Sequence, residues 1–455
     1  MLFLRWIGFV VWIGCLSGSV AFGDDWPGWL GPGRDGSSGA GDVPTRWSTT
    51  ENIAWQVDLE GAGNSSPIVW SDQVIITATT GIQHDTLHVL SFQRSDGTPQ
   101  WSTRLFGSGT PVLFTMFPPE RGNALSTPCT DGQRIVALFG TGDIACLDMD
   151  GHPKWFRALN QDYGEFTNEY GVAASPVLAD GKVVIQVDQA GDSYLIALDG
   201  ETGQTVWRTP RTASDNWTTP ALATIGGCRQ VICSGTYQVI GYDWADGTPR
   251  WTAEGVARLC TPTPLVHGSD IIVSSAPDGA VVAWQFDLRS GSQNEPAERW
   301  RSTRGVGFIP TGVRVSTVRE ITVQCPRAPR GRGQGEGAEN ASVISRTVLN
   351  DLLFLASDRG IATCFDAQTG QMQWQERIGG TYRASLIAAG GNVYFTSLEG
   401  VTTVVRAASE YQLVSRNDLG QSIAATPAIT EGALFVRTER QLICIRADSA
   451  CRTGP

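Results

Sequence analysis

Short apolar runs separated by clusters of turn residues follow one another along most of the chain. One unit of this pattern, residues 176–208, contains four such runs, which are Pro176–Leu178, Val183–Asp188, Tyr194–Leu198 and Thr205–Arg208. The turns between them have the composition of β-hairpin turns, and they are Ala179-Asp180-Gly181, Ala190-Gly191-Asp192 and Gly200-Glu201-Thr202-Gly203. The unit therefore predicts one four-stranded antiparallel sheet.

The end of this unit recurs through the chain as a Gly-x-x-x-Trp spacing. It occurs at Gly97–Trp101, Gly151–Trp155, Gly203–Trp207, Gly247–Trp251 and Gly370–Trp374. A further copy ends at Trp300 after extra residues, and another has Val414 in the tryptophan position. A single sheet cannot bury both of its faces, and radial packing of sheets into a closed ring leaves few exposed edges. The repeat thus predicts a β-propeller.

The start of each unit is marked by a serine or threonine ahead of an apolar run. The positions followed by proline are Ser66, Thr127, Ser175, Thr219, Thr263 and Thr426, and those assigned without proline are Ser345 and Ser385. The last unit, residues 424–445, ends before any tryptophan, whereas Asn52–Trp55 carries a lone final-strand pattern. We therefore expect an all-β, eight-bladed propeller whose last blade is completed, without a covalent bond, by the strand of Trp55. It is interpreted as a single domain over residues 24–455, with an inserted flexible loop at 305–341.

The N-terminus has the features of an export signal. Residues 1–23 contain one cation, Arg5, followed by an apolar run that begins at Trp6, and small residues near Gly23 place the mature start near Asp24. A lipid-modified start at Cys15 is the alternative. No later segment is long and apolar enough to span a bilayer. We expect a periplasmic or extracellular protein.

The formal net charge of -11 argues against a nucleic-acid partner, because such a surface repels phosphate. One local cluster of arginines, at Arg327, Arg330 and Arg332, is followed at once by Glu336 and Glu339. The Gly-rich stretch that holds them is interpreted as a solvated loop rather than an RNA-binding segment.

Two stretches carry a resemblance to a known family. The pattern Ala197-x-Asp199-x-x-Thr202-Gly203-x-x-x-Trp207 resembles the repeat of the pyrroloquinoline quinone (PQQ) propeller family, and Cys364–Trp374 repeats it with one change. The resemblance covers nearly the whole mature chain, including the opening Asp25-Trp26-Pro27-x-x-x-Gly31-Pro32 that is typical of one exported bacterial branch. It implies that the repeat tryptophans tie neighbouring blades together, and these are Trp55, Trp101, Trp155, Trp207, Trp251, Trp300 and Trp374. The family includes quinoprotein dehydrogenases and non-catalytic relatives such as the lipoprotein propeller of the outer-membrane β-barrel assembly machinery, so fold does not choose the function.

The chain lacks the cysteine patterns of quinoprotein alcohol dehydrogenases. The resemblance implies adjacent bonded cysteines against the cofactor and, in many members, a Cys-x-x-Cys-His haem segment, but the ten cysteines here are scattered. We predict no cofactor, and PQQ with calcium enters only with the dehydrogenase alternative. No metal site is predicted, because His84 and His88 lie on a hairpin and its strand, and Asp148-Met-Asp150-Gly151 coincides with a repeat turn. The motifs Gly-x-Ser-x-Gly and His-Glu-x-x-His do not occur.

Loops inserted ahead of the innermost strands form the candidate ligand face, because loops on a rigid scaffold carry binding more often than strands do. The insertions at 106–123 and 161–171 are rich in side chains that make directional contacts, and two further pairs precede other inner strands. The candidate residues are Glu120, Arg121, Asn123, Tyr163, Asn168, Tyr170, Asn216, Trp217, Tyr382 and Arg383.

The leading interpretation is a non-catalytic extracytoplasmic binding or scaffold protein for a protein or cell-envelope ligand. The alternative is a PQQ-dependent oxidoreductase that acts on alcohols or sugars. A third class, a hydrolase or lyase that uses carboxylates at the channel mouth, stays open because carboxylate pairs across blades are invisible in a sequence.

Overall fold

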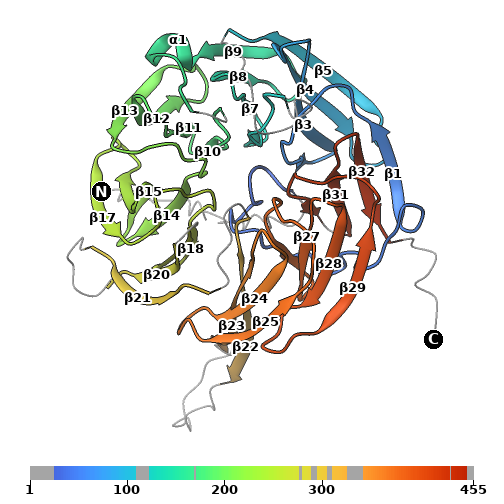
Figure 1. Ribbon diagram of the computed structural model, residues 1–455, viewed down its shortest axis with the longest axis vertical. Helices are drawn as coiled ribbons and strands as arrows, with labels where there is room; N and C mark the ends of the chain where they lie inside the picture. Colours follow the sequence, from blue (N-terminus) through green and yellow to red (C-terminus); the bar gives the residue numbers. More distant parts are fainter. Residues whose placement is uncertain are drawn as a thin grey trace, which may run out of the picture.

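Eight four-stranded antiparallel sheets surround a central channel (Figure 1). The computed structural model describes residues 25–108, 122–168, 171–275, 279–287, 295–304, 310–324, 342–430 and 432–447. Within these ranges the only helix is α1 (Leu159–Tyr163). The predicted all-β, eight-bladed propeller is confirmed.

Blades 1 to 4 follow one another along the chain, each from its innermost to its outermost strand. Blade 1 is β2 (Ile68–Trp70), β3 (Gln73–Thr80), β4 (Thr86–Gln93) and β5 (Pro99–Phe106). Blade 2 is β6 (Cys129–Thr130), β7 (Ile135–Leu138), β8 (Asp143–Leu147) and β9 (Pro153–Ala158). Blade 3 is β10 (Val177–Ala179), β11 (Lys182–Val187), β12 (Ser193–Asp199) and β13 (Thr205–Arg211). Blade 4 is β14 (Ala221–Ile225), β15 (Cys228–Gly235), β16 (Gln238–Asp243) and β17 (Pro249–Glu254).

Blades 5 to 8 continue the ring. Blade 5 is β18 (Leu265–His267), β19 (Asp270–Ser274), β20 (Val281–Gln285) and β21 (Ala297–Ser302). Blade 6 is β22 (Val313–Gln324), β23 (Ser342–Ala356), β24 (Ile361–Asp366) and β25 (Met372–Arg377). Blade 7 is β26 (Ile387–Ala389), β27 (Asn392–Thr396), β28 (Val401–Arg406) and β29 (Leu413–Asp418). Blade 8 is β30 (Ala428–Thr430), β31 (Ala433–Arg437), β32 (Gln441–Arg446) and β1 (Ile53–Asp58).

The strand order fixes which loops share a face. The loops that arrive at each innermost strand, and the turns between second and third strands, lie at one end of the channel, which we call the mouth face. The turns between first and second strands, and between third and fourth strands, lie at the other end, which we call the floor face. The described residues directly ahead of β6 and β10, which include Asn123 and Asn168, therefore belong to the mouth face.

The middle strands of the blades are buried on both sides, because each blade packs between two others. In β11 the consecutive residues Val183, Val184 and Ile185 all have 0% exposure. Their sequence is therefore a continuous apolar run rather than an alternating one. The outermost strands alternate instead, as in β5, where exposed and half-buried positions take turns.

The repeat tryptophans join each blade to the next. Five of the indoles, those of Trp55, Trp101, Trp155, Trp207 and Trp300, lie against a glycine of the following blade. Trp155 lies against Gly203, whose φ is +71° and where an added Cβ would lie 2.7 Å from Trp155 Cδ2. The indole nitrogen also donates to a carbonyl of that blade, in the pairs Trp55 to Arg94, Trp101 to Met149, Trp155 to Gly200, Trp207 to Trp244, Trp300 to Ala367 and Trp374 to Ala408. Trp251 donates instead to Gln230 Oε1 within its own blade, at 2.7 Å.

A ring of hydroxyl groups joins the blades around the channel. At seven of the eight blade junctions, a serine or threonine ahead of the inner strand accepts the backbone N–H of its counterpart in the preceding blade. At the eighth, Thr263 Oγ1 accepts the indole N–H of Trp29, in the N-terminal segment, instead. The seven links run from Ser66 to Thr127, Thr127 to Ser175, Ser175 to Thr219, Thr263 to Thr311, Thr311 to Ser385, Ser385 to Thr426 and Thr426 to Ser66. The sequence assignment of Ser345 to this ring is wrong. Thr311 takes the position, because the inner strand β22 begins at Val313 and Ser345 lies on the second strand, β23.

The ring closes as the sequence predicts. Strand β1 pairs antiparallel with β32, with Trp55 opposite Cys444 and Val57 opposite Leu442. The first strand along the chain and the last one thus complete one sheet, and main-chain hydrogen bonds close the propeller.

Residues 25–47, which we call the plug, cross the channel near the floor face, where Figure 1 shows the blue N-terminal chain at the centre of the ring. Trp26 exchanges main-chain hydrogen bonds with Val69 of blade 1, and Gly36 and Ser38 bond to Ala388 of blade 7. One segment that contacts blades on different sides of the channel must span it. Trp26 and Leu30 are 1% and 0% exposed, so the plug is part of the core.

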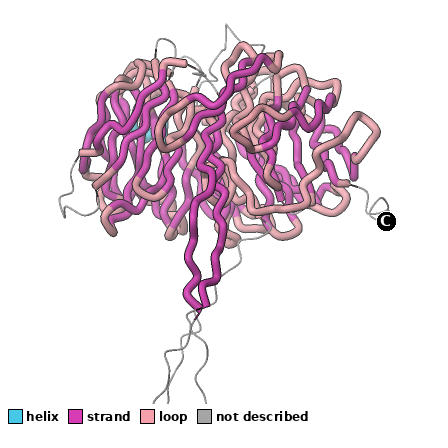
Figure 2. Tube along the Cα trace, turned by 90° about the horizontal axis from the view of Figure 1, so that it is seen from below, coloured by secondary structure: helices cyan, strands magenta, loops and turns pink. Residues whose placement is uncertain are grey.

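Part of the expected 305–341 loop is a strand. Residues Val313–Gln324 form β22, which pairs with β23 from Val313 opposite Phe354 to Gln324 opposite Ser342. Strand β24 pairs with β23 only over Leu352–Ala356, so the far part of the hairpin extends beyond the blade and projects from the floor face (Figure 2). The arginine cluster at 327–332 lies outside the described residues.

Candidate functional site

Seven of the ten candidate residues belong to the described part of the chain; Glu120, Arg121 and Tyr170 lie outside it. Asn123 is 1% exposed and fastens its loop to blade 1. Its N–H donates to Thr79 Oγ1 at 3.2 Å, and its Nδ2 donates to the His84 carbonyl at 3.1 Å. Asn123 therefore positions the mouth-face loop rather than offering its amide to a ligand.

Asn168, Trp217 and Asn216 join the mouth-face loops of three blades. Trp217 Nε1 donates to Asn168 Oδ1 at 2.9 Å, and Asn168 Nδ2 donates to the Asp188 carbonyl at 2.9 Å. Asn216 Oδ1 accepts the N–H of Cys260 at 2.6 Å. The structure thus brings three of the candidate residues together, as cross-links that hold the loops of blades 3, 4 and 5 in one rigid arrangement.

A buried ion pair in blade 3 lies next to these loops. Arg211 Nε donates to Asp188 Oδ1 at 2.7 Å, and both side chains are almost fully buried. Burial alone would lower the pKa of Arg211, but Asp188 outweighs it and the pKa is raised. Gln186 Nε2 also donates to Asp188 Oδ2 at 2.7 Å. Sequence reasoning missed this network, because Gln186 is in β11, Asp188 follows that strand and Arg211 is in β13, and the three share no motif.

Tyr163 lies away from the channel, at the outer edge between blades 2 and 3. Its hydroxyl is 2.7 Å from Thr205 Oγ1, and the guanidinium carbon of Arg208 lies 4.9 Å from its ring centroid. The insertion after β9 forms α1, which turns this side chain toward the outermost strand of blade 3. It therefore does not join the other candidates.

Tyr382 and Arg383 precede the inner strand of blade 7. Tyr382 is 1% exposed, and burial raises the pKa of its hydroxyl to about 12. Arg383 is half-buried, and burial lowers its pKa. The tyrosine ring belongs to the core between blades 6 and 7.

The mouth face contains a cavity that sequence reasoning missed, between blades 4 and 5. It has a volume of about 460 Å³. The base of the cavity is apolar, with Val256, Ala257 and Ala280 all buried. Tyr237, which is 57% exposed, and Arg258 stand at its edge. No motif marks these residues, since Tyr237 comes from a turn and Arg258 from the next arrival loop.

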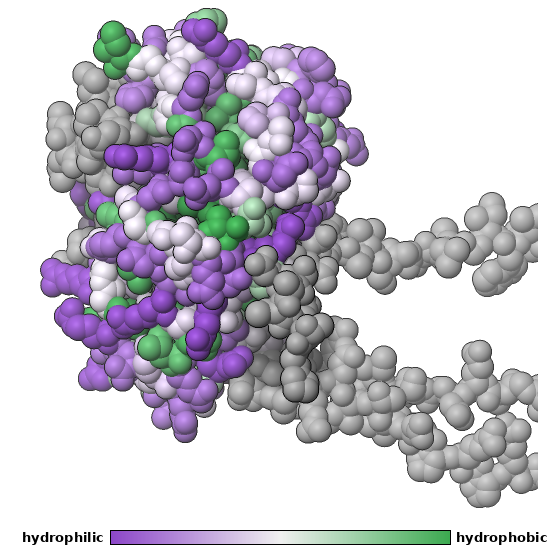
Figure 3. All heavy atoms as spheres, turned by 90° about the vertical axis from the view of Figure 1, so that its right-hand side faces the viewer, coloured by the Kyte–Doolittle hydropathy of each residue, from purple (hydrophilic) through white to green (hydrophobic). Residues whose placement is uncertain are grey.

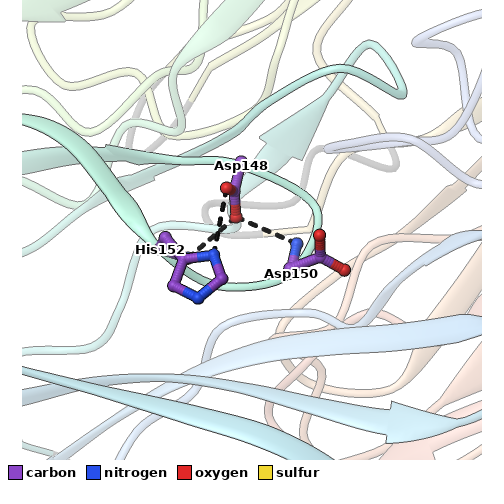
Figure 4. Close-up of side chains that lie close together, drawn as sticks. All are labelled: Asp148, Asp150 and His152. Atoms are coloured by element: carbon purple, nitrogen blue, oxygen red, sulfur yellow. Dashed lines mark hydrogen bonds and ion pairs between the residues drawn. The ribbon is translucent and has the colours of Figure 1, made fainter.

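The candidate metal ligands behave as turn residues. Asp148, Asp150 and His152 gather in the β8–β9 turn (Figure 4), where Asp148 Oδ1 accepts the N–H groups of Asp150 and His152 at 3.0 and 2.8 Å. His152 Nδ1 lies 3.1 Å from Asp148 Oδ2. Asp148 is thus used to hold the turn. His88 Nε2 contacts Thr80 Oγ1 at 2.8 Å, and His84 and His88 belong to no cluster of potential ligands among the described residues.

The described residues do not fit a calcium and quinone site in the channel. The groups that line it at the ring are hydroxyls already engaged between blades, and the plug crosses its floor end. The nearby carboxylate of Asp188 is committed to Arg211 and Gln186. The described cysteines are unbonded thiols, which are Cys129, Cys146, Cys228, Cys233, Cys260, Cys364 and Cys444.

The fold and the site together define a PQQ-type eight-bladed propeller whose fastened loops and cavity lie on the mouth face. The chain matches the family described as outer membrane protein assembly factor BamB over residues 39–191, 88–300 and 191–449, and it belongs to that family. A curated relative, the outer membrane protein assembly factor BamB of Yersinia pestis, is 23% identical over 256 residues. That alignment covers 54% of this chain and 59% of the relative.

Solved structures of a BamB protein and of a dehydrogenase share the fold of this chain. BamB from Moraxella catarrhalis has a TM-score of 0.57 at 14% identity, covering 87% of this chain and 97% of that one. A europium-containing methanol dehydrogenase has a TM-score of 0.61 at 12% identity, covering 91% of this chain and 89% of that one. At such identities the likeness concerns the fold alone. In the described part of the chain, no helix has the length and apolar character needed to cross a membrane.

Proposed function

We propose that this chain is a non-catalytic extracytoplasmic scaffold that docks a protein partner on its mouth face. The observation that carries the proposal is the fastening of neighbouring mouth-face loops to one another, through Trp217 with Asn168 and Asn216 with Cys260. Loops fixed in this way form a preorganised surface, which reduces the ordering cost of binding. Membership in a family of assembly factors points to the same kind of partner.

The dehydrogenase alternative has one observation in its favour, the fold shared with a methanol dehydrogenase. A titration of the mature protein with PQQ and calcium separates the two, because a ligand bound only by the folded state raises its stability by about 2.7 kcal/mol at a hundredfold excess over Kd. We expect no change in melting temperature. A saturable rise would replace the scaffold proposal with the dehydrogenase.

The extracytoplasmic part of the proposal rests on the export signal, and intact mass tests it. The protein recovered from the envelope fraction of its host should have the mass of a chain that begins near Asp24. A chain that begins at a lipid-modified Cys15 would still be exported but anchored. Recovery of the full-length chain in the cytoplasm would contradict the proposal.

A further inference from the structure

The turn that carries Tyr237 holds this side chain in an unfavourable backbone conformation. Thr236 and Tyr237 have φ of +40° and +71°, in a region where glycine or asparagine is usual. Three main-chain hydrogen bonds fix them to the next arrival loop, from Thr236 to Arg258, from Tyr237 to Ala257 and from Gly255 to Tyr237. The aromatic ring is nevertheless 57% exposed. Strain that is held in place under an exposed tyrosine suggests a function in binding.

The charge around the cavity is unbalanced. Arg301 is paired with Glu298 at 2.7 Å, and its Nη1 donates to the Gly255 carbonyl at 2.6 Å. The exposed side chain of Arg258 has no hydrogen bond or ion pair with any other described residue. An arginine with no partner among the described residues thus lies beside a buried apolar surface, on a chain whose net charge is -11. A ligand that complements this combination carries a carboxylate, for Arg258, next to an aliphatic group, for the apolar surface.

We propose that the cavity between blades 4 and 5 binds a peptide segment in which an aliphatic side chain adjoins an acidic one. The aliphatic group would rest on Val256, Ala257 and Ala280, with the Tyr237 ring along its side, and the carboxylate would pair with Arg258. Tyrosine and arginine are the residue types that most often dominate binding energy at protein interfaces. The inference deepens the proposed docking function and rests on it.

Two synthetic probes test this chemistry. Each is an otherwise neutral Ser/Gly peptide, with a central Leu-Glu pair in one and Leu-Lys in the other, assembled as a tetramer on streptavidin so that weak binding becomes measurable. We expect the Leu-Glu probe to bind the mature protein at least about tenfold more tightly. Equal binding of the two probes, or no binding of Leu-Glu, would overturn the proposal.

Matched variants locate the binding. Arg258→Gln should weaken Leu-Glu binding about fivefold or more and remove the preference over Leu-Lys. Tyr237→Ala should weaken both probes, and Tyr237→Asn should do the same while suiting the left-handed turn. Arg377→Gln, which removes an exposed arginine at the end of β25 on the mouth face of blade 6, should change nothing. Leu-Glu binding that is unchanged in Arg258→Gln would refute the site. If photoreactive residues on the mouth face still form covalent adducts with a protein partner in that case, the docking proposal stands and only the proposed cavity chemistry fails.

Discussion

Single glycines set the spacing between blades. The repeat glycine needs a left-handed backbone to make its turn, and its missing Cβ leaves room for the tryptophan of the preceding blade. At Gly31 the same two requirements meet inside the plug, where φ is +76° and an added Cβ would lie 2.7 Å from the Trp26 ring. The spacing of Trp26 and Gly31 in the opening motif therefore has a packing reason.

Substituting Gly203 separates these two requirements. Gly203→Ala should lower the free energy of unfolding by roughly 2 kcal/mol or more, since it adds both backbone strain and a clash with Trp155. Gly181 is the matched control, because its φ is +72° but no atom lies within 4 Å of an added Cβ. Gly181→Ala should cost about 1 kcal/mol. Equal losses in urea unfolding would show that the tryptophan contact is unimportant.

The ion pair of Arg314 and Asp351 gives a pH-dependent contribution to stability. Arg314 Nε donates to Asp351 Oδ1 at 2.6 Å. Burial alone would raise the pKa of Asp351, but Arg314, with Ser316 and Gln368, outweighs it and holds the pKa below its ordinary value. A depressed pKa means that the stabilisation is complete above the unfolded pKa of about 4 and is lost as pH falls through the folded value.

Replacing this carboxylate tests the assignment. Asp351→Asn should be less stable than the wild type at pH 6, because the buried Arg314 loses one of its two carboxylate partners and keeps only Asp270. The difference should shrink as pH is lowered below about 4, where the wild type also loses the charge. Melting temperatures of both proteins across this range provide the comparison. A difference that does not change with pH would rule out ionisation of Asp351 as the cause.

At the scale of elements, the N-terminal region stabilises the ring in two separable ways. Strand β1 completes blade 8, whereas the plug fills the floor end of the channel. Deleting residues 24–50 removes the plug but keeps β1, and deleting residues 24–59 removes both. The second deletion should lower the melting temperature well beyond the first, because it leaves β32 as an unpaired edge and exposes the neighbours of Trp55. Equal melting temperatures would contradict closure by β1.

The plug has its own test. Trp26→Ala removes a fully buried indole and should cost about 3–5 kcal/mol, as expected for a large-to-small core substitution. Trp29→Ala is the comparison, because Trp29 is only half-buried and makes one hydrogen bond, to Thr263 Oγ1. It should cost clearly less in denaturant unfolding. Similar losses would show that burial of Trp26 contributes no more to stability than the half-buried Trp29 does.

The sequence predicted those elements that repeat. The number of blades, the strand order and the closing strand all follow from comparing the units, because every unit is a four-stranded sheet that buries both faces against its neighbours. Thr311 was missed because the extension of β22 and β23 moves the unit out of register with its neighbours. The plug and the cavity were missed for a different reason. They depend on contacts between residues far apart in the chain, such as Trp29 with Thr263, which no periodic pattern records.

At the scale of the whole molecule, the two ends of the channel are unequal. The plug and the β22–β23 hairpin belong to the floor face, whereas the cross-linked loops and the cavity belong to the mouth face. The side of the ring seen in Figure 3 is mainly hydrophilic, with apolar areas that are small and separated. Such a side offers little for a stable protein contact. We place the partner on the mouth face because its loops are fastened to one another and because it holds the cavity.

Site-specific photocrosslinking in the native host tests that placement most directly. A photoreactive residue is introduced at exposed positions on the mouth face, Ile82 and Thr303, on the floor face, Glu201, and on the outer edge, Leu413. We predict a discrete adduct with another envelope protein from the mouth-face positions and none from Glu201 or Leu413. Adducts from Glu201 or Leu413 in the absence of mouth-face adducts would contradict it.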